Sequence, residues 1–227
     1  MVLRRISVFL PLAAALLISL VALWGCGSST DFVAKDEPWR AAEERSCINA
    51  GGVRESAFVR GKSALGGPSV CGAEHPFEMS AADNGRVALK PSAMLRCPMI
   101  PQVDSWVADV VEPAARMHLG QTIAELQVAA SYACRPIDSI PGNKLSEHGY
   151  ANALDVSAFV MADGSKINVK SGWNGSDRER KFLHAVHDGA CHNFTTVLGP
   201  DADGYHRDHF HMDLARHGRD GMFRVCK

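Results

Sequence analysis

The sequence predicts an α+β fold in which flanking helices cover a central antiparallel sheet that disulfides stabilise. Strand-like runs are interleaved with a few helical segments, which is the pattern of a mixed domain. The connections have the character of hairpins rather than regular helical crossovers, and this favours antiparallel pairing. The chain also contains seven cysteines, a number that suits a fold held by covalent cross-links.

The composition is that of an ordinary globular protein, with 46% hydrophobic and 22% charged residues in a chain of 227. One compact domain of roughly 150–200 residues accounts for this length once the N-terminal segment is set aside. The formal net charge is −1, and the sequence has no basic stripe and no basic patch with interleaved aromatic residues. Nucleic-acid binding is therefore not expected.

The N-terminal residues 1–25 have the pattern of an export signal, with Arg4 and Arg5 ahead of a long apolar run. This run is about long enough to span a bilayer, so a permanent transmembrane anchor is the alternative. The run ends in "LWGC", which resembles the lipobox of bacterial lipoproteins and implies lipidation of Cys26. We expect a periplasmic lipoprotein, with the outer membrane favoured, and a polar tether over residues 26–46.

The cysteine count agrees with export. If Cys26 carries lipid, an even number of cysteines is left for disulfides in an oxidising compartment. No CxxC pair occurs, which argues against a cysteine-based zinc site. The pairing stays open among the six candidates, which are Cys47, Cys71, Cys97, Cys134, Cys191 and Cys226. We place the folded domain at residues 47–227.

In the first half of this domain, the sequence predicts little regular structure, followed by one long helix. Residues 47–97 are rich in glycine and serine and indicate loops and short strands. Residues 103–120 carry apolar side chains at helical spacing. Asp104 or Ser105 is expected to cap this helix, and Gly120 is expected to end it.

The second half predicts, in order, a strand at 122–135, a hairpin at 152–169, a helix at 176–191, and strands at 194–200 and 208–215. The hairpin turns at Asp163 and Gly164, a dipeptide typical of tight turns. Ser176 or Asp177 is expected to cap the helix, which should close near Gly189.

Two histidine-containing stretches suggest a metal site on the sheet. In "HRDHFHMD", strand alternation places His209 and His211 on one face, with Asp213 continuing it. In "LSEHGYANALDVS", His148 and Asp155 are separated by small residues that allow close backbone packing. Imidazoles with a carboxylate and no thiolate are typical ligands of a catalytic zinc ion. The alternative is a set of surface histidines on a strand.

The stretches "SYACRP", "LSEHGYANALDVSAF" and "HRDHFHMDLA" together resemble the extensin-like C-terminal domain family of bacterial proteins. The resemblance extends from about Cys47 to Cys226. That family is in turn similar to zinc peptidases of the lysostaphin, D-Ala-D-Ala carboxypeptidase and hedgehog type. Their shared pattern, SxHxxGxAxD followed by a histidine-containing strand, is matched here by Ser146, His148 and Asp155.

The resemblance implies a zinc ion held by His148, Asp155 and His211, with one position left for water. It also implies a general base, either His209 or Asp208. A regular strand would direct His209 toward the metal and Asp208 away from it, which favours His209. Asp208 remains the alternative if the strand begins only after it.

Further side chains are candidates for contact with a substrate. Arg135 matches an arginine that carboxypeptidase-like relatives place near the substrate carbonyl, where it would stabilise an oxyanion; a surface salt bridge is the alternative. Ser146, His206 and Trp173 are expected to contact substrate. The alternative for His206 is an exposed histidine in a loop. The alternative for Trp173 is a structural residue that covers the core.

These features lead to one preferred function and two alternatives. The preferred function is an exported, zinc-dependent hydrolase that cleaves an amide bond in peptidoglycan peptides and is held to a membrane through Cys26. The first alternative is a non-catalytic zinc-containing lipoprotein that binds the cell wall or regulates it. The second is metal storage by the histidines from His184 onward, which predicts more than one ion per chain.

Overall fold

The computed structural model describes residues 30–227, and residues 1–29 are not described. The expected signal peptide and Cys26 therefore lie outside the described residues. Within the described part of the chain, no helix combines the length and apolar character needed to cross a membrane.

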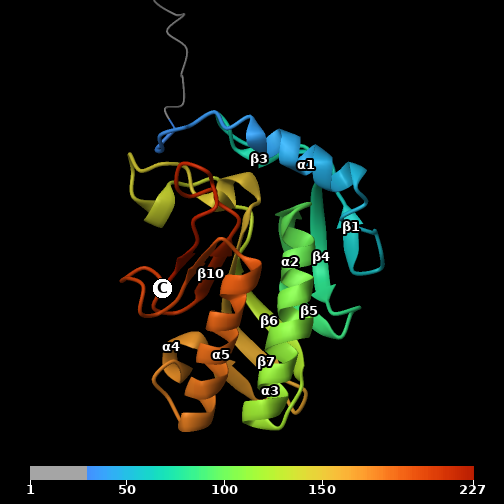
Figure 1. The fold of residues 1–227 in the computed structure, drawn as a ribbon, viewed down its shortest axis with the longest axis vertical. Helices are drawn as coiled ribbons and strands as arrows, with labels where there is room; N and C mark the ends of the chain where they lie inside the picture. Colours follow the sequence, from blue (N-terminus) through green and yellow to red (C-terminus); the bar gives the residue numbers. More distant parts are fainter. Residues whose placement is uncertain (1–29) are drawn as a thin grey trace, which may run out of the picture. The chain divides into compact units, whose positions relative to one another are not determined.

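A nine-stranded sheet organises residues 59–226, with the strand order β1-β4-β5-β6-β7-β10-β9-β11 and β8 paired to β7 (Figure 1). The strands are β1 (Val59–Gly61), β4 (Pro76–Ala82), β5 (Val87–Arg96), β6 (Ile123–Ala130), β7 (Ala153–Met161), β8 (Lys166–Asn168), β9 (Thr196–Leu198), β10 (Phe210–Asp213) and β11 (Val225–Cys226). A separate small ribbon pairs β2 (Leu65–Gly66) with β3 (Gly72–Ala73).

The sheet is mixed, so the expectation of an antiparallel sheet is confirmed for most of its strand pairs but not for all of them. The β5–β6 and β9–β11 pairs are parallel, and the other pairs are antiparallel. Between β5 and β6 the chain forms a helical crossover, which is the connection that parallel neighbours require. This crossover consists of α2 (Met99–Trp106), the π-helical turn η1 (Val107–Val111) and α3 (Glu112–Leu119).

The crossover helices and α5 (Asp177–Asn193) cover one face of the sheet (Figure 1). Trp106 is fully buried between them, where its ring lies edge-on to Phe159 and Phe194. Its indole N–H donates to the carbonyl of Val186 on α5 at 3.1 Å. The main hydrophobic core therefore lies between the sheet and this helical layer. The opposite face of the sheet is not covered by these helices.

Several elements of the second half match their predictions. The β7–β8 hairpin turns at Asp163 and Gly164, and Ser176 caps α5 in a reciprocal capping box with Glu179. However, α5 continues past Gly189. A Cβ atom at that position would lie only 2.3 Å from Val110, so this glycine allows close packing of α5 against η1 rather than ending the helix.

The helix expected at 103–120 begins earlier, at Met99, and ends as predicted at Gly120 in a left-handed conformation (φ 68°). Neither Asp104 nor Ser105 caps it. Instead, a carboxylate oxygen of Asp104 accepts the backbone N–H of Asp83 at 2.8 Å, which fixes the turn between β4 and β5. These two long strands replace the loops and short strands expected over much of residues 47–97.

The part of the expected tether that the structure describes is folded. Phe32 is buried in a small cluster with Cys71, Leu145 and Tyr150, and Val33 forms a parallel bridge with Lys144. Helix α1 (Trp39–Asn49) then begins well before Cys47. The aromatic side chain of Phe32 accounts for part of the difference, because it packs on the domain instead of remaining in solvent.

Three disulfides join the six cysteines expected to pair: Cys47–Cys97, Cys71–Cys134 and Cys191–Cys226. Cys47–Cys97 connects α1 to the end of β5. Cys71–Cys134 fixes the loop that follows β6, and Cys191–Cys226 ties the C-terminal strand to α5.

Candidate metal centre

The register between β7 and β10 places Asp155 directly opposite His211. On β10, His211 lies between Phe210 and Met212, which both belong to the hydrophobic core. Successive side chains of a strand point to opposite faces. His211 and its partner Asp155 therefore face away from the helical layer, into the open side of the sheet.

His148 reaches the same point from the short helix η3 (Glu147–Tyr150). The hydroxyl of Ser146 caps this turn by accepting the backbone N–H of His148 at 3.4 Å. Ala151 ends the turn in a left-handed conformation (φ 52°), at the position where the SxHxxGxAxD pattern has glycine. Gly149 is also required, because a Cβ atom there would lie 2.6 Å from the side chain of Leu145. The tight turn directs His148 at the sheet.

The donor atoms of His148, Asp155 and His211, which we call the donor trio, form a compact triangle. His148 Nε2 lies 3.2 Å from His211 Nδ1. Carboxylate oxygens of Asp155 lie 3.1 Å from the former nitrogen and 2.9 Å from the latter. Ligands of a tetrahedral zinc ion, each about 2.0–2.1 Å from the metal, are separated by about 3.3 Å. The trio therefore fits one zinc ion in both chemistry and spacing.

The charges of the trio are set by its own hydrogen bonds. Burial raises the pKa of Asp155, but hydrogen bonds from His148 and His211 outweigh it and hold this pKa well below its ordinary value. Burial lowers the pKa of His211, whereas hydrogen bonds to Asp155 and Asp213 raise it to about 10. Asp155 is therefore an anion, and a metal ion would take the place of the proton on His211 Nδ1.

His209 and Asp208 both precede β10, which begins only at Phe210 instead of at the expected residue 208. The Nε2 atom of His209 lies 3.7 Å from an oxygen of Asp155, beside the donor trio. Its Nδ1 atom donates to Asp208 Oδ1 at 2.9 Å. The side chain of Asp208 is 60% exposed, compared with 18% for His209, and only His209 lines the cleft above the trio.

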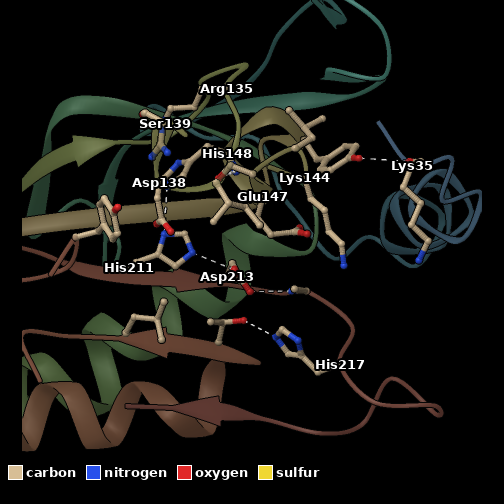
Figure 2. Close-up of a pocket in the computed structure, with 18 of the residues that line it drawn as sticks. Lys35, Arg135, Asp138, Ser139, Lys144, Glu147, His148, His211, Asp213 and His217 are labelled. Atoms are coloured by element: carbon tan, nitrogen blue, oxygen red, sulfur yellow. Dashed lines mark hydrogen bonds and ion pairs between the residues drawn. The ribbon is translucent and has the colours of Figure 1, made fainter. Parts of the chain in front are cut away.

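A cleft of about 620 Å³ opens beside the donor trio, and Figure 2 shows Arg135, His148 and His211 among the residues that line it. Arg135 Nη2 lies 4.0 Å from an oxygen of Asp155. His206 is buried in the wall, with its Nδ1 atom 2.8 Å from Asp203 and its ring 5.6 Å from that of His211. The structure thus brings both expected residues to the site.

The other two expected substrate contacts differ from each other in position. Ser146 lines the cleft but is buried, and its hydroxyl caps η3 by accepting the backbone N–H of His148. Trp173 does not line the cleft. It is buried in the main core and stacks on His184 with the ring centroids 3.9 Å apart. The core alternative for Trp173 is therefore the correct one.

The histidines of α5 do not form a second metal site in the described residues. His187 lies near Cys191 and Cys226, but these two sulfurs are joined in a disulfide and are not available as thiolates. His187 Nε2 also contacts the C-terminal carbonyl of Lys227 at 3.0 Å. This arrangement gives no support to metal storage along α5.

A partly buried ion pair that lines the cleft was not anticipated from the sequence. Arg40 on α1 makes two hydrogen bonds, of 2.7 and 2.6 Å, to the carboxylate of Glu147 in η3. The guanidinium also lies over the ring of Tyr150, 4.0 Å from its centroid. Asn152 donates a further hydrogen bond to Glu147 at 2.6 Å. Partners separated by 107 positions leave no local sequence signal.

The sequence can now be compared with known families. The family model described as the extensin-like protein C-terminus matches residues 45–227. The chain belongs to this family. The family segment contains the whole donor trio together with Arg135 and His209, whereas Arg40 precedes it. No curated protein and no solved structure matches this extensin-like chain significantly.

Proposed function

We propose that this extensin-like protein is an exported zinc-dependent hydrolase that cleaves an amide bond in peptidoglycan peptides. The observation that carries the proposal is the donor trio, two imidazoles and one carboxylate within hydrogen-bond distance of one another, whose two imidazoles line a cleft. Such a ligand set leaves a coordination position open, as in catalytic zinc sites. The choice of peptidoglycan rests on the resemblance to lysostaphin-type and carboxypeptidase-type zinc peptidases.

His148, Asp155 and His211 would hold the metal ion. When bound, zinc supplies Lewis acidity, which polarises a carbonyl group and lowers the pKa of water. Both histidines are oriented for this task. The carbonyl of Ser131 accepts a hydrogen bond from His148 Nδ1 at 2.5 Å, which leaves Nε2 free to coordinate. The carboxylate of Asp155 lies opposite His211 on the neighbouring strand.

We assign the role of general base to His209. Its Nδ1–H is donated to Asp208, so the lone pair of Nε2 faces the donor trio and can accept a proton. Asp208 then holds the ring in this tautomer instead of acting as the base itself. Its greater exposure and its position outside the cleft support this division of roles.

Arg135 would stabilise negative charge on the substrate. Its guanidinium lines the cleft close to Asp155, and the Cys71–Cys134 disulfide fixes the residue that precedes it. Donors fixed in advance near a developing oxyanion lower the barrier of acyl transfer. The cleft also contains lysine and glutamate side chains, which suit a peptide with charged groups.

The test is incubation of zinc-loaded protein with purified peptidoglycan sacculi, followed by mass analysis of the released fragments. We expect His211→Ala to lose both zinc and cleavage. The exposed His75 does not line the cleft, so His75→Ala is the matched control and should retain both zinc and cleavage. Cleavage by His211→Ala at the wild-type rate would contradict the proposal.

The same experiment distinguishes the non-catalytic alternative. Zinc bound at one ion per chain and sacculi retained without fragments at any pH would indicate a cell-wall-binding protein. The anchoring of the chain to a membrane through Cys26 is a separate proposal. It predicts that Cys26→Ser releases the protein from the membrane fraction of the producing cell.

A further inference from the structure

Asp213 lies two residues beyond His211 on β10 and is buried beside it. Its Oδ2 atom is 3.0 Å from His211 Nε2, on the opposite side of the ring from the donor trio (Figure 2). Its Oδ1 atom accepts the backbone N–H of Ala215 at 2.9 Å. The hydroxyl of Thr196 on β9 provides another hydrogen bond. A carboxylate with this many donors around it has a fixed orientation.

The direction of each hydrogen bond in this group follows from simple chemistry. An ionised carboxylate can only accept, so the proton between Asp213 and His211 belongs to Nε2. The other ring nitrogen, Nδ1, faces His148 and Asp155, and a metal ion bound there would displace the proton that Nδ1 shares with Asp155. The same logic applies to His148, whose Nδ1–H is given to the carbonyl of Ser131.

The network continues to the rim of the cleft. The hydroxyl of Thr196 lies beside the carboxylate of Asp213 and 2.7 Å from His217 Nε2. His217 is partly exposed, and all four side chains of the chain His211–Asp213–Thr196–His217 line the cleft. Side chains from β9, β10 and the C-terminal loop thus form one connected group that ends at the ring of His211.

We infer that Asp213 is a positioning residue that commits His211 to present Nδ1 to the metal ion, and that Thr196 supports it. This inference rests on the proposed zinc site. It adds Asp213, a hydrogen-bond partner of His211 that is not itself a member of the donor trio. Such partners orient a ligating histidine and strengthen it as a ligand, and their loss weakens metal binding by about 10- to 100-fold.

The experiment measures the zinc dissociation constant of the full chain by competition with a chromogenic chelator. Asp213→Asn has nearly the same size, but its amide can accept only through one oxygen and must place an N–H group among the donors that now face the carboxylate. We expect its affinity for zinc to fall about 10- to 100-fold. Thr196→Val removes one hydroxyl donor and should cost about fivefold, the value of one hydrogen bond.

Two controls separate positioning from a general loss of structure. Thr195→Val removes a neighbouring hydroxyl that bonds to the backbone carbonyls of Asp213 and Ala215, so its zinc affinity should match the wild type. Asp208→Asn, the same chemical change beside His209, should also retain zinc affinity. Melting of the metal-free variants shows whether each one is folded, and Thr196→Val tests the inference even if Asp213→Asn does not fold.

The possible failures are distinguishable. If the wild-type protein binds zinc and both Asp213→Asn and Thr196→Val bind it equally well, the positioning role is wrong and the proposed function stands. If the wild-type protein binds no zinc, the proposed function and this inference fall together. A loss of affinity in Thr195→Val equal to that in Thr196→Val would also overturn the inference, because the effect would not depend on the side chain of Asp213.

Discussion

Each histidine beside the cleft floor has one ring nitrogen committed to a fixed acceptor and the other directed at the site. His148 donates to a backbone carbonyl, and His209 donates to Asp208. The chemical difference between them lies in their distance from the trio: His148 is part of it, whereas His209 lies 3.7 Å from the oxygen of Asp155. The proposed function therefore assigns metal binding and proton transfer to different rings, and substitutions can test the two separately.

Substitution of the proposed base should reduce turnover without removing zinc. We expect His209→Ala to lower kcat on muropeptides by about 10²- to 10⁴-fold, the usual contribution of a general base. Asp208→Asn should cause a smaller loss, because the histidine remains and only its orientation is weakened. Metal content should stay at the wild-type value in both variants. Full turnover by His209→Ala combined with an inactive Asp208→Asn would identify Asp208 as the base.

Arg135 provides a second test at the level of single residues. Loss of its guanidinium in Arg135→Ala should reduce kcat by about 10²- to 10³-fold, as expected for one oxyanion donor. Arg135→Lys keeps the charge but lacks the planar fork, so it should recover only part of the rate. Steady-state kinetics check this prediction. A change confined to KM would instead mean that Arg135 binds the substrate equally well before and during reaction.

At the level of elements, α1 and η3 are joined by the buried pair of Arg40 and Glu147. Their side chains are only 11% and 15% exposed. Burial lowers the pKa of Arg40, but hydrogen bonds and charge from Glu147 and Glu37 outweigh it and raise this pKa above its ordinary value. The pair therefore stays charged. It connects η3, which carries His148, to helix α1.

Breaking this pair on one side should destabilise the domain. We expect Arg40→Met to lower the free energy of unfolding by about 1.5–3 kcal/mol, since it leaves the partly buried carboxylate of Glu147 without its main hydrogen-bond donor. Removing both charges in Arg40→Met/Glu147→Gln should recover part of that loss. Urea denaturation of the metal-free proteins measures both values. A double variant as unstable as the sum of the two single variants would contradict the coupling.

The sequence predicted those parts of the fold and the site that depend on local patterns. The turn signal at Asp163 and Gly164 located β7, strand alternation located β10 and placed His211 with Asp213, and the capping signal located α5. The parallel pairing of β5 with β6 could not be read locally, because it depends on a crossover helix whose start at Met99 lacks a capping side chain. The contact between Arg40 and Glu147 likewise depends on tertiary packing alone.

At the level of the whole molecule, one face of the sheet contributes to the hydrophobic core and the other carries the donor trio. Leu154 and Val156 belong to the hydrophobic core on the helical side, while Asp155 between them belongs to the donor trio. The trio joins η3, β7 and β10, segments that are well separated along the chain. A ligand that binds all three can exist only on the folded sheet, so its binding energy adds to the stability of the entire domain.

Zinc should therefore raise the melting temperature of the wild-type protein. Free zinc at 100 times its dissociation constant adds about 2.7 kcal/mol to the folded state. For a domain of this size that corresponds to an increase of roughly 5–10 °C, which differential scanning calorimetry would detect and a chelator would reverse. His211→Ala should show no such increase, because its trio is incomplete, whereas His75→Ala should respond like the wild type. An equal increase in His211→Ala would mean that zinc stabilises the protein from a different place, and the donor trio would then lose its assignment as the metal site.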